Sequence, residues 1–308
     1  MVSFNLITGF LGSGKTTLLS HLLTELSVTK RIAVIQNEFA ASGIDGKELQ
    51  QDNEGFKLVE INNGSVFCVC QLSSFVENIH KLIDEYQPEI IFLEASGLAD
   101  PISIIELIQT DKLKDKITLD KSICLVDAPN FFNGLSSLVR FKHQLMIADK
   151  IIINKTDLFE GDIDDVVQVI KELNSYADFI FTSYAKVTWQ EIEIDELSQG
   201  VAAKRFIGEQ SDGMPDINAC VLRTHNRISE RQLTAFISEL QVDCPRIKGY
   251  LNLNDDRVVS IHSVYDTMEL KELKNYVGPS ELIAFGYNLT IGNLRKKFKK
   301  YLSNEQKH

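Results

Sequence analysis

The chain has 308 residues, of which 44% are hydrophobic and 24% are charged, a composition typical of a globular protein long enough for two domains. Its net charge of −11 opposes a phosphate backbone, so we expect no nucleic-acid partner. No apolar run is long enough to cross a bilayer and no signal-type segment precedes the first strand. We therefore expect a cytoplasmic protein with no membrane partner.

The first turn of the chain has the pattern of a phosphate-binding loop. An apolar strand near residues 4–7 leads into residues 9–16, Gly-Phe-Leu-Gly-Ser-Gly-Lys-Thr, and an apolar helix follows. In such a loop the backbone N–H groups and the helix N-terminus bind phosphates, Lys15 reaches the outer phosphates, and Thr16 ligates Mg²⁺. The alternative is an accidental glycine-rich turn. The predicted nucleotide-binding residues are Gly12, Ser13, Gly14, Lys15, Thr16 and Thr17.

Short apolar strands alternate with helices after this loop. The predicted strands are residues 31–35, 57–61, 89–93, 122–126, 150–153 and 178–181, and an amphipathic helix is predicted at 72–86. This alternation is typical of a mostly parallel sheet with helices on both faces. We therefore predict an α/β fold of the P-loop NTPase type over residues 1–200.

Glu94 and Gly97 follow the buried strand at 89–93 with the spacing of the second switch of GTPases. There an acid lies near Mg²⁺ and a glycine amide lies near the γ-phosphate. With Lys15, these two residues form the predicted catalytic set. Leu98 occupies the position where Ras-type GTPases have the glutamine that orients the attacking water, so we expect slow intrinsic hydrolysis.

A guanine-reading motif follows the strand at 150–153. The carboxylate of Asp157 can accept hydrogen bonds from the N1–H and N2–H₂ groups of guanine, and the stem of Lys155 can pack along the base. Asn154 completes the Asn-Lys-x-Asp pattern, and Ser183 lies in a segment that suits a second base-contacting loop. A surface turn that caps a helix is the alternative for the tetrapeptide alone. The pairing with the phosphate loop predicts GTP and GDP as ligands, with an ATP-dependent enzyme as a weaker alternative.

The pattern changes in the last third of the chain. Glycine and proline mark a linker at 201–217, and residues 218–308 contain further strands and helices. Strands are predicted at 219–224, 246–253, 258–265 and 281–287, a helix at 229–242 with Ser229 as its N-cap, and a terminal helix from Thr290. This layout predicts a smaller α+β C-terminal domain.

The five cysteines fall into two groups. Cys124, Cys220 and Cys244 are predicted to be small core or loop residues. Cys68 and Cys70 lie in a predicted loop, where two thiolates one residue apart can face one ion such as Zn²⁺ with two further N or O ligands. The alternatives are two small structural residues in a strand-to-helix connection, or an exposed redox dithiol.

Taken together, these motifs resemble the CobW-type GTPases, which are relatives of the nickel-insertion GTPases of urease and hydrogenase. The similar stretches are residues 9–17, 37–39, 43–45, 94–101, 144–149, 154–157, 221–223 and 246–251. The resemblance implies a GTP-dependent metallochaperone. The family's metal site is a Cys-x-Cys-Cys run between the switches, where this chain has Cys68-Val69-Cys70-Gln71 and lacks the third cysteine. The resemblance also implies Glu38, in the first switch, as a third ligand beside the two thiolates.

The expected function is therefore a slow GTPase that uses Mg²⁺ and couples its nucleotide state to the binding and delivery of a transition metal, Zn²⁺ or Co²⁺. Its expected partner is a client metalloenzyme or cofactor-assembly protein, and the oligomeric state is left open, a homodimer included. The alternative is a GTP-regulated activator or scaffold that transfers no metal and whose cysteines are incidental.

Overall fold

The computed structural model describes residues 1–37, 56–61, 69–97, 99–137, 139–174, 177–194, 217–265, 267–273, 276, 278–287 and 289–302. The chain divides into two compact units, Met1–Gln199 and Gly200–His308. Most of the linker expected at 201–217 lies outside the described residues. No helix in the described part of the chain is long and apolar enough to cross a membrane.

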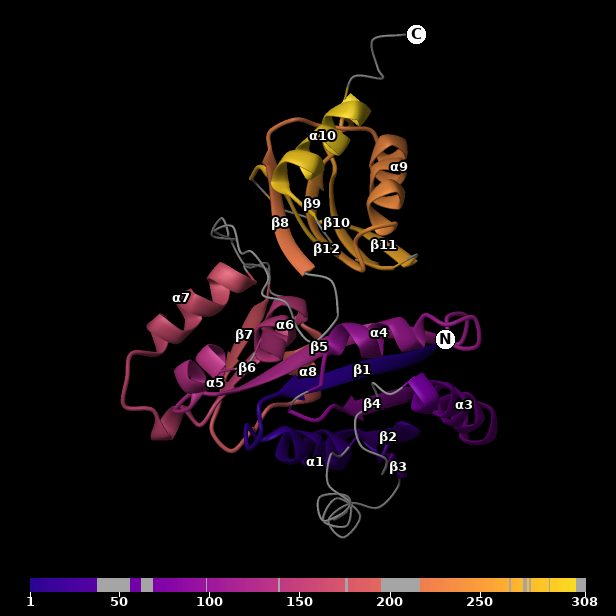
Figure 1. Ribbon diagram of the computed structural model, residues 1–308, viewed down its shortest axis with the longest axis vertical. Coiled ribbons are helices and arrows are strands. Elements are labelled where there is room, and N and C mark those ends of the chain that lie inside the picture. Colours follow the sequence, from indigo (N-terminus) through magenta and orange to yellow (C-terminus); the bar gives the residue numbers. More distant parts are fainter. Residues whose placement is uncertain are drawn as a thin grey trace. The chain divides into compact units, whose positions relative to one another are not determined.

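The first unit contains a seven-stranded sheet in which every pair of neighbouring strands is parallel, in the order β3-β2-β4-β1-β5-β6-β7 (Figure 1). After β4 the chain crosses to the other side of β1, so β1 is the point where the strand order reverses. In open parallel sheets, ligands bind at the carboxyl ends of the strands around such a point. The strands are β1 (Val2–Gly9), β2 (Ile32–Asn37), β3 (Phe56–Ile61), β4 (Ile90–Glu94), β5 (Ile117–Asp127), β6 (Lys150–Asn154) and β7 (Asp178–Phe181).

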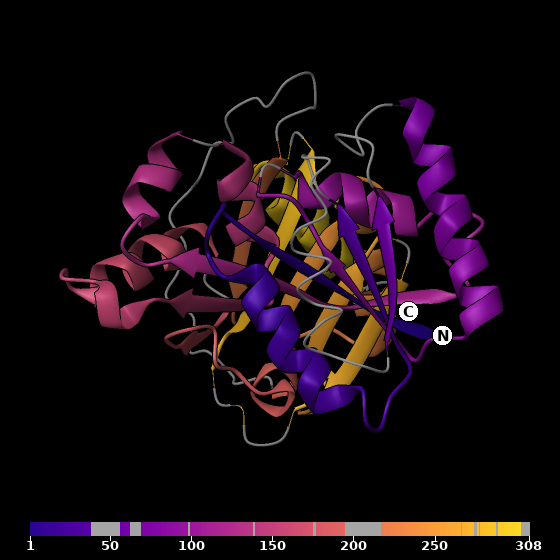
Figure 2. The same ribbon diagram turned by 90° about the horizontal axis from the view of Figure 1, so that it is seen from below.

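Helices cover both faces of this sheet because its central strands are apolar on both sides. The apolar face of α1 packs on one side of the sheet (Figure 2). On the same side, Trp189 of α8 meets Phe92 edge to face at 5.5 Å between ring centroids. Helices α4 and α6 pack against each other, and α6 also contacts β1 and β5. The helical segments are α1 (Lys15–Leu26), α3 (Val69–Tyr86), α4 (Pro101–Ile108), α5 (Phe131–Ser137), α6 (Val139–Ile147), η1 (Thr156–Leu158), α7 (Ile163–Leu173) and α8 (Trp189–Glu193).

Three element boundaries correct the expectations from the sequence. Strand β2 continues to Asn37, because Gln36 pairs with β4 although it is polar. Strand β5 begins at Ile117 and not at residue 122, and its polar first half pairs with β1 through a register shift between Phe4 and Asn5. Helix α3 begins at Val69, which places the backbone of Cys70 in the first helical turn and not in a loop.

The second unit is an antiparallel sheet in the order β11-β10-β9-β12-β8, with α9 and α10 packed together. Their apolar faces meet in a core where the ring centroids of Phe236 and Phe298 lie 5.2 Å apart. A sheet with a pair of helices confirms the predicted α+β layout. Ser229 caps α9 through a capping box with Gln232, as predicted. The elements are β8 (Ile217–Thr224), α9 (Glu230–Gln241), β9 (Arg246–Asn252), β10 (Val258–Val264), β11 (Thr267–Glu272), β12 (Ser280–Tyr287) and α10 (Ile291–Leu302).

Strand β11 was not expected from the sequence. Its six residues, Thr-Met-Glu-Leu-Lys-Glu, contain three charged side chains and pair only with β10 at the edge of the sheet. Charged side chains are common on edge strands because they discourage pairing with other chains. A polar edge strand of this kind gives a weak pattern when the sequence is considered alone.

Candidate functional site

The predicted phosphate loop joins the carboxyl end of β1 to α1. Gly9, at φ 137°, lies so close to β5 that a Cβ there would be 2.3 Å from the carbonyl oxygen of Leu125. Gly14 is the N-cap of α1 at φ 103°; no side chain caps the helix and no acid lies in its first turn. The free N–H groups of this first turn and the helix dipole therefore suit an anion such as a phosphate.

The ammonium group of Lys15 lies inside the loop. Lys15 is only 7% exposed, and its Nζ donates to the carbonyl oxygens of Gly9 at 3.1 Å and Phe10 at 3.2 Å. This arrangement holds a positive charge inside the loop that is predicted to bind phosphates. The role of Lys15 in phosphate binding stays a prediction.

Glu94 joins the loop to two neighbouring strands. The hydroxyl of Thr16 donates to its Oε1 at 2.8 Å, and the side-chain amide of Gln36 donates to its Oε2 at 2.9 Å. A hydroxyl and a carboxylate in contact are hard oxygen donors, which fit Mg²⁺. Sequence reasoning predicted Thr16 and Glu94 but missed Gln36, whose position became meaningful only when β2 was found to extend to Asn37.

Gly97 lies against the phosphate loop. A Cβ at Gly97 would be 2.8 Å from the backbone nitrogen of Leu11, so a larger residue would displace the loop. Gly97 is buried, and its N–H donates to no acceptor among the described residues. Leu98, the residue that follows, lies outside the described residues.

Asn154 connects the phosphate loop to residues 182–186, which are predicted to form a second base-contacting loop and are called the second base loop below. It is 2% exposed; its Nδ2 donates to the carbonyl of Ser13 at 2.9 Å, and its Oδ1 accepts from the N–H of Ala185 at 2.9 Å. The amide of Asn154 leaves no room for a side chain at Gly14, because a Cβ there would lie 2.6 Å from Nδ2. Asn154 therefore fixes the two loops relative to each other.

Lys155 and Asp157, the predicted base-reading pair, differ in their contacts. Lys155 has a left-handed backbone, φ 61°, and its ammonium group forms an ion pair with the buried carboxylate of Asp127 at 2.7 Å. The carboxylate of Asp157 is exposed and has no partner among the described residues, while its N–H donates to the Ser183 hydroxyl at 3.3 Å. Asp127 was missed by sequence reasoning, since it ends β5 and meets Lys155 only because β5 and β6 are neighbours.

The second base loop is strained. Tyr184 and Ala185 both have positive φ, 57° and 50°, which non-glycine residues rarely adopt. Such backbone costs of order 1 kcal/mol per residue and persists where surrounding contacts hold it. Here the contacts come from Asn154 and from the ring of His21 on α1, whose Nδ1 lies 2.9 Å from the Ala185 carbonyl.

The predicted transition-metal ligands fall mostly outside the described part of the chain. Glu38 and Cys68 are not described, and of Cys70 only the helical backbone is. No group of three or more His, Cys, Asp or Glu that could hold a metal occurs among the described residues. The strands that precede Glu38 and Cys68 are neighbours, because β2 and β3 are parallel and their last residues, Asn37 and Ile61, are paired. Both strands therefore end at the carboxyl edge of the sheet, where Gln36 of β2 pairs with Glu94.

The three other cysteines are buried free thiols, as expected. Burial raises the pKa of Cys124 to about 12 and that of Cys244 to about 12. Thiols of this kind are inert because the thiolate is the reactive and metal-binding form.

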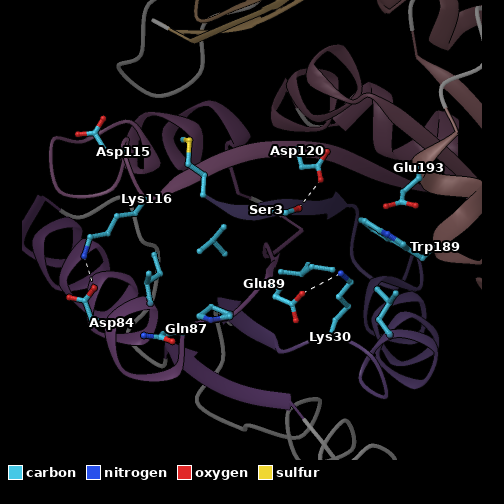
Figure 3. Close-up of a pocket in the computed structure, with 16 residues that line it drawn as sticks. Ser3, Lys30, Asp84, Gln87, Glu89, Asp115, Lys116, Asp120, Trp189 and Glu193 are labelled. Carbon is cyan, nitrogen blue, oxygen red and sulfur yellow. Dashed lines mark hydrogen bonds and ion pairs between the residues drawn. The ribbon is translucent and has the colours of Figure 1, made fainter. Parts of the chain in front are cut away.

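A large hollow lies at the amino edge of the same sheet (Figure 3). It is open, has a volume of about 1070 Å³, and is lined by the ends of β1, α1 and α3 and by Trp189 and Glu193. Two ion pairs lie at its surface, Lys30 with Glu89 at 3.3 Å and Lys116 with Asp84. None of the predicted nucleotide-binding residues lines it.

Two family models match the chain. The CobW/HypB/UreG nucleotide-binding domain matches residues 3–181, and the Cobalamin synthesis protein cobW C-terminal domain matches residues 217–302. The chain belongs to the CobW/HypB/UreG family. This confirms the resemblance drawn from the motifs, together with the α/β P-loop fold and its smaller C-terminal domain.

Curated members of this family are similar to the chain over part of its length. "Zinc chaperone YeiR" of Escherichia coli is 36% identical over 169 residues, 54% of this chain and 51% of YeiR. "Zinc-regulated GTPase metalloprotein activator 1" of Schizosaccharomyces pombe is 32% identical over 195 residues, 60% of this chain and 47% of that protein. The matches thus span about half the length of these relatives. The crystal structure of Zn(II)-bound YjiA GTPase from E. coli has the same fold, with a TM-score of 0.62 at 20% identity over 97% of this chain and 98% of YjiA.

Proposed function

We propose that this protein is a slow GTPase and metallochaperone that couples its nucleotide state to the binding and delivery of Zn²⁺ or Co²⁺. Its client would be a metalloenzyme or cofactor-assembly protein in the cytoplasm. The observation that carries the proposal is the meeting of Thr16, Glu94 and Gln36 at one sheet edge. The strand that carries Gln36 leads directly into the segment of Glu38.

The nucleotide part rests on two groups of contacts. The uncapped start of α1 and the ammonium group of Lys15 would hold the phosphates, and Asp157, Lys155 and Ser183 would hold guanine. Thr16 and Glu94 would hold Mg²⁺, which neutralises charge on the β- and γ-phosphates when bound. Hydrolysis is slow in this proposal because Leu98 is apolar and cannot orient a water.

The coupling part rests on the chain's path between the strands. Gln36 donates to Glu94, and two residues later comes Glu38, the candidate metal ligand. A change in the contacts of Glu94 between GTP and GDP would move the end of β2 and with it this ligand. A two-state element shared by both sites makes each ligand alter the affinity of the other.

A double substitution tests the metal part. In Cys68→Ser/Cys70→Ser we expect Zn²⁺ and Co²⁺ binding, and the Co²⁺–thiolate absorption, to be lost while GTP affinity is retained. Cys220→Ser is the matched control, because Cys220 is a buried thiol that donates to the Leu289 carbonyl and a hydroxyl can do the same. Undiminished metal binding by the double variant would contradict the proposal that Cys68 and Cys70 are metal ligands.

The second candidate is a GTP-regulated activator that remodels a partner without transferring metal. Gln71 favours it, since an amide stands where the family's third thiolate was expected and an amide oxygen is a poor ligand for a borderline ion. The same double variant separates the two functions. A scaffold keeps partner binding and GTPase activity without the thiolates, whereas a metallochaperone loses client activation.

A further inference from the structure

Gln144, on α6, contacts the segment that follows the second-switch strand. Its side chain is fully buried, and its Nε2 donates to the carbonyl oxygens of Gly97 at 3.4 Å and Ala99 at 2.9 Å. These carbonyls lie on either side of Leu98. One buried amide therefore binds the backbone of both Gly97 and Ala99, and a buried hydrogen-bonded amide is costly to displace.

The held segment also contacts the phosphate loop. Gly97 is packed against the backbone of Leu11, with a hypothetical Cβ only 2.8 Å from the Leu11 nitrogen. The other end of the segment is Asp100, which caps α4 by accepting from the N–H of Ile102 at 3.1 Å. His143 of α6 lies 4.0 Å from the second oxygen of Asp100. Helix α6 thus contacts this segment at both of its ends.

We propose that Gln144 is a positioning residue that sets the affinity for the γ-phosphate. By holding the carbonyls of Gly97 and Ala99, it fixes the backbone of Gly97 against the phosphate loop, and the Gly97 N–H donates to no acceptor among the described residues. GDP has no γ-phosphate, so loss of this alignment lowers the affinity for GTP and leaves the affinity for GDP unchanged. The inference rests on the proposed GTP-binding function.

The test compares Gln144→Leu with a change at a matched buried amide that contacts the C-terminal end of α6. Asn174 is 2% exposed, and its Nδ2 donates to the carbonyls of Leu145 and Ala148 at 2.9 and 2.8 Å. Asn174→Leu removes the same chemistry, so both variants are expected to lower Tm. Only Gln144→Leu is expected to change the ratio of affinities for a non-hydrolysable GTP analogue and GDP.

The expected fall in that ratio is about 10- to 100-fold, which corresponds to one hydrogen bond to a charged group. The KM for GTP should rise in parallel in steady-state hydrolysis. Gln144→Met, which keeps the length of the side chain, gives the same measurement if the leucine variant does not fold. An unchanged ratio in the Gln144 variants, or an equal change in Asn174→Leu, would overturn the inference. Failure of the wild-type protein to bind either guanine nucleotide would instead overturn the proposed function.

Discussion

The two edges of the parallel sheet differ in how their polar residues are held. At the carboxyl edge, Asn154, Glu94 and Gln144 are buried, and the side chain of each forms two hydrogen bonds to other residues. At the amino edge, the charges of the large hollow are exposed surface pairs such as Lys30–Glu89. Exposed pairs contribute little because water screens them, whereas a buried amide must be matched by partners. A hollow's size is thus a poorer guide to function here than buried, directional contacts.

The largest expected contrast concerns the cysteines. At pH 8 a thiol with a pKa of about 12, such as Cys124 or Cys244, is about 0.01% thiolate, roughly 1000-fold less than an ordinary cysteine. We expect a thiol reagent to modify only Cys68 and Cys70 in the native protein from pH 7 to 9, because the buried thiolates form only as pH approaches 12. Mass spectrometry after peptide digestion identifies the sites. In denaturant all five cysteines should react, and rapid native labelling of Cys124 would contradict the burial described here.

Replacing the lysine of the phosphate loop should nearly abolish nucleotide binding. Lys15→Ala removes a buried positive charge, and we expect at least a 100-fold loss of GTP affinity by calorimetry. Lys171→Ala is the control and should bind GTP normally. It removes an ammonium group that lies over the ring of Phe179 on β7. Retained GTP binding by Lys15→Ala would show that the phosphates bind elsewhere.

The next effect concerns base selection. Asp157→Asn replaces a carboxylate that accepts two hydrogen bonds from guanine by an amide that donates where guanine also donates. We expect GTP affinity to fall about 10- to 100-fold and the preference for GTP over ATP to be lost. Competition binding measures both. Asp164→Asn, in the first turn of α7, should change neither.

A smaller effect is expected at the partner of Lys155. Asp127→Asn weakens the 2.7 Å ion pair that anchors the lysine beside the base. Because the Lys155 side chain is 30% exposed, the lysine can still be hydrated, and we expect only about a 3- to 10-fold loss of GTP affinity. A loss as large as that of Asp157→Asn would mean that Asp127 itself contacts the nucleotide.

The sequence predicted those features that are local. The phosphate loop and the Asn154–Asp157 motif need only neighbouring residues, and the apolar strands need only their own pattern. The contacts of three other residues depend on the strand order and on the packing of α6, namely Gln36, Asp127 and Gln144. A local sequence pattern does not contain this information. Strand β11 was missed because an edge strand has few buried side chains. Glu38 and Cys68 stay predictions, since they lie outside the described residues.

The smallest effect is expected at the amino edge. The Arg31 backbone N–H and the Lys30 ammonium lower the pKa of Glu89, and Lys116 lowers that of Asp84, but all these groups are exposed. Lys30→Ala and Lys116→Ala should leave GTP affinity and hydrolysis within about twofold of the wild type. A large loss in either variant would show that the hollow of Figure 3 takes part in the function and would remove the contrast between the two edges.

The central claim is that the metal and the γ-phosphate act on one shared element at the carboxyl edge. It is tested most directly by titrating the anaerobic protein with Zn²⁺ and with Co²⁺, once in GDP and once in a non-hydrolysable GTP analogue. We predict that metal affinity differs between the two states by a factor of about 5 to 150, and that the metal changes the ratio of affinities for the analogue and GDP by the same factor. Equal metal affinities in the two nucleotide states would contradict the coupling.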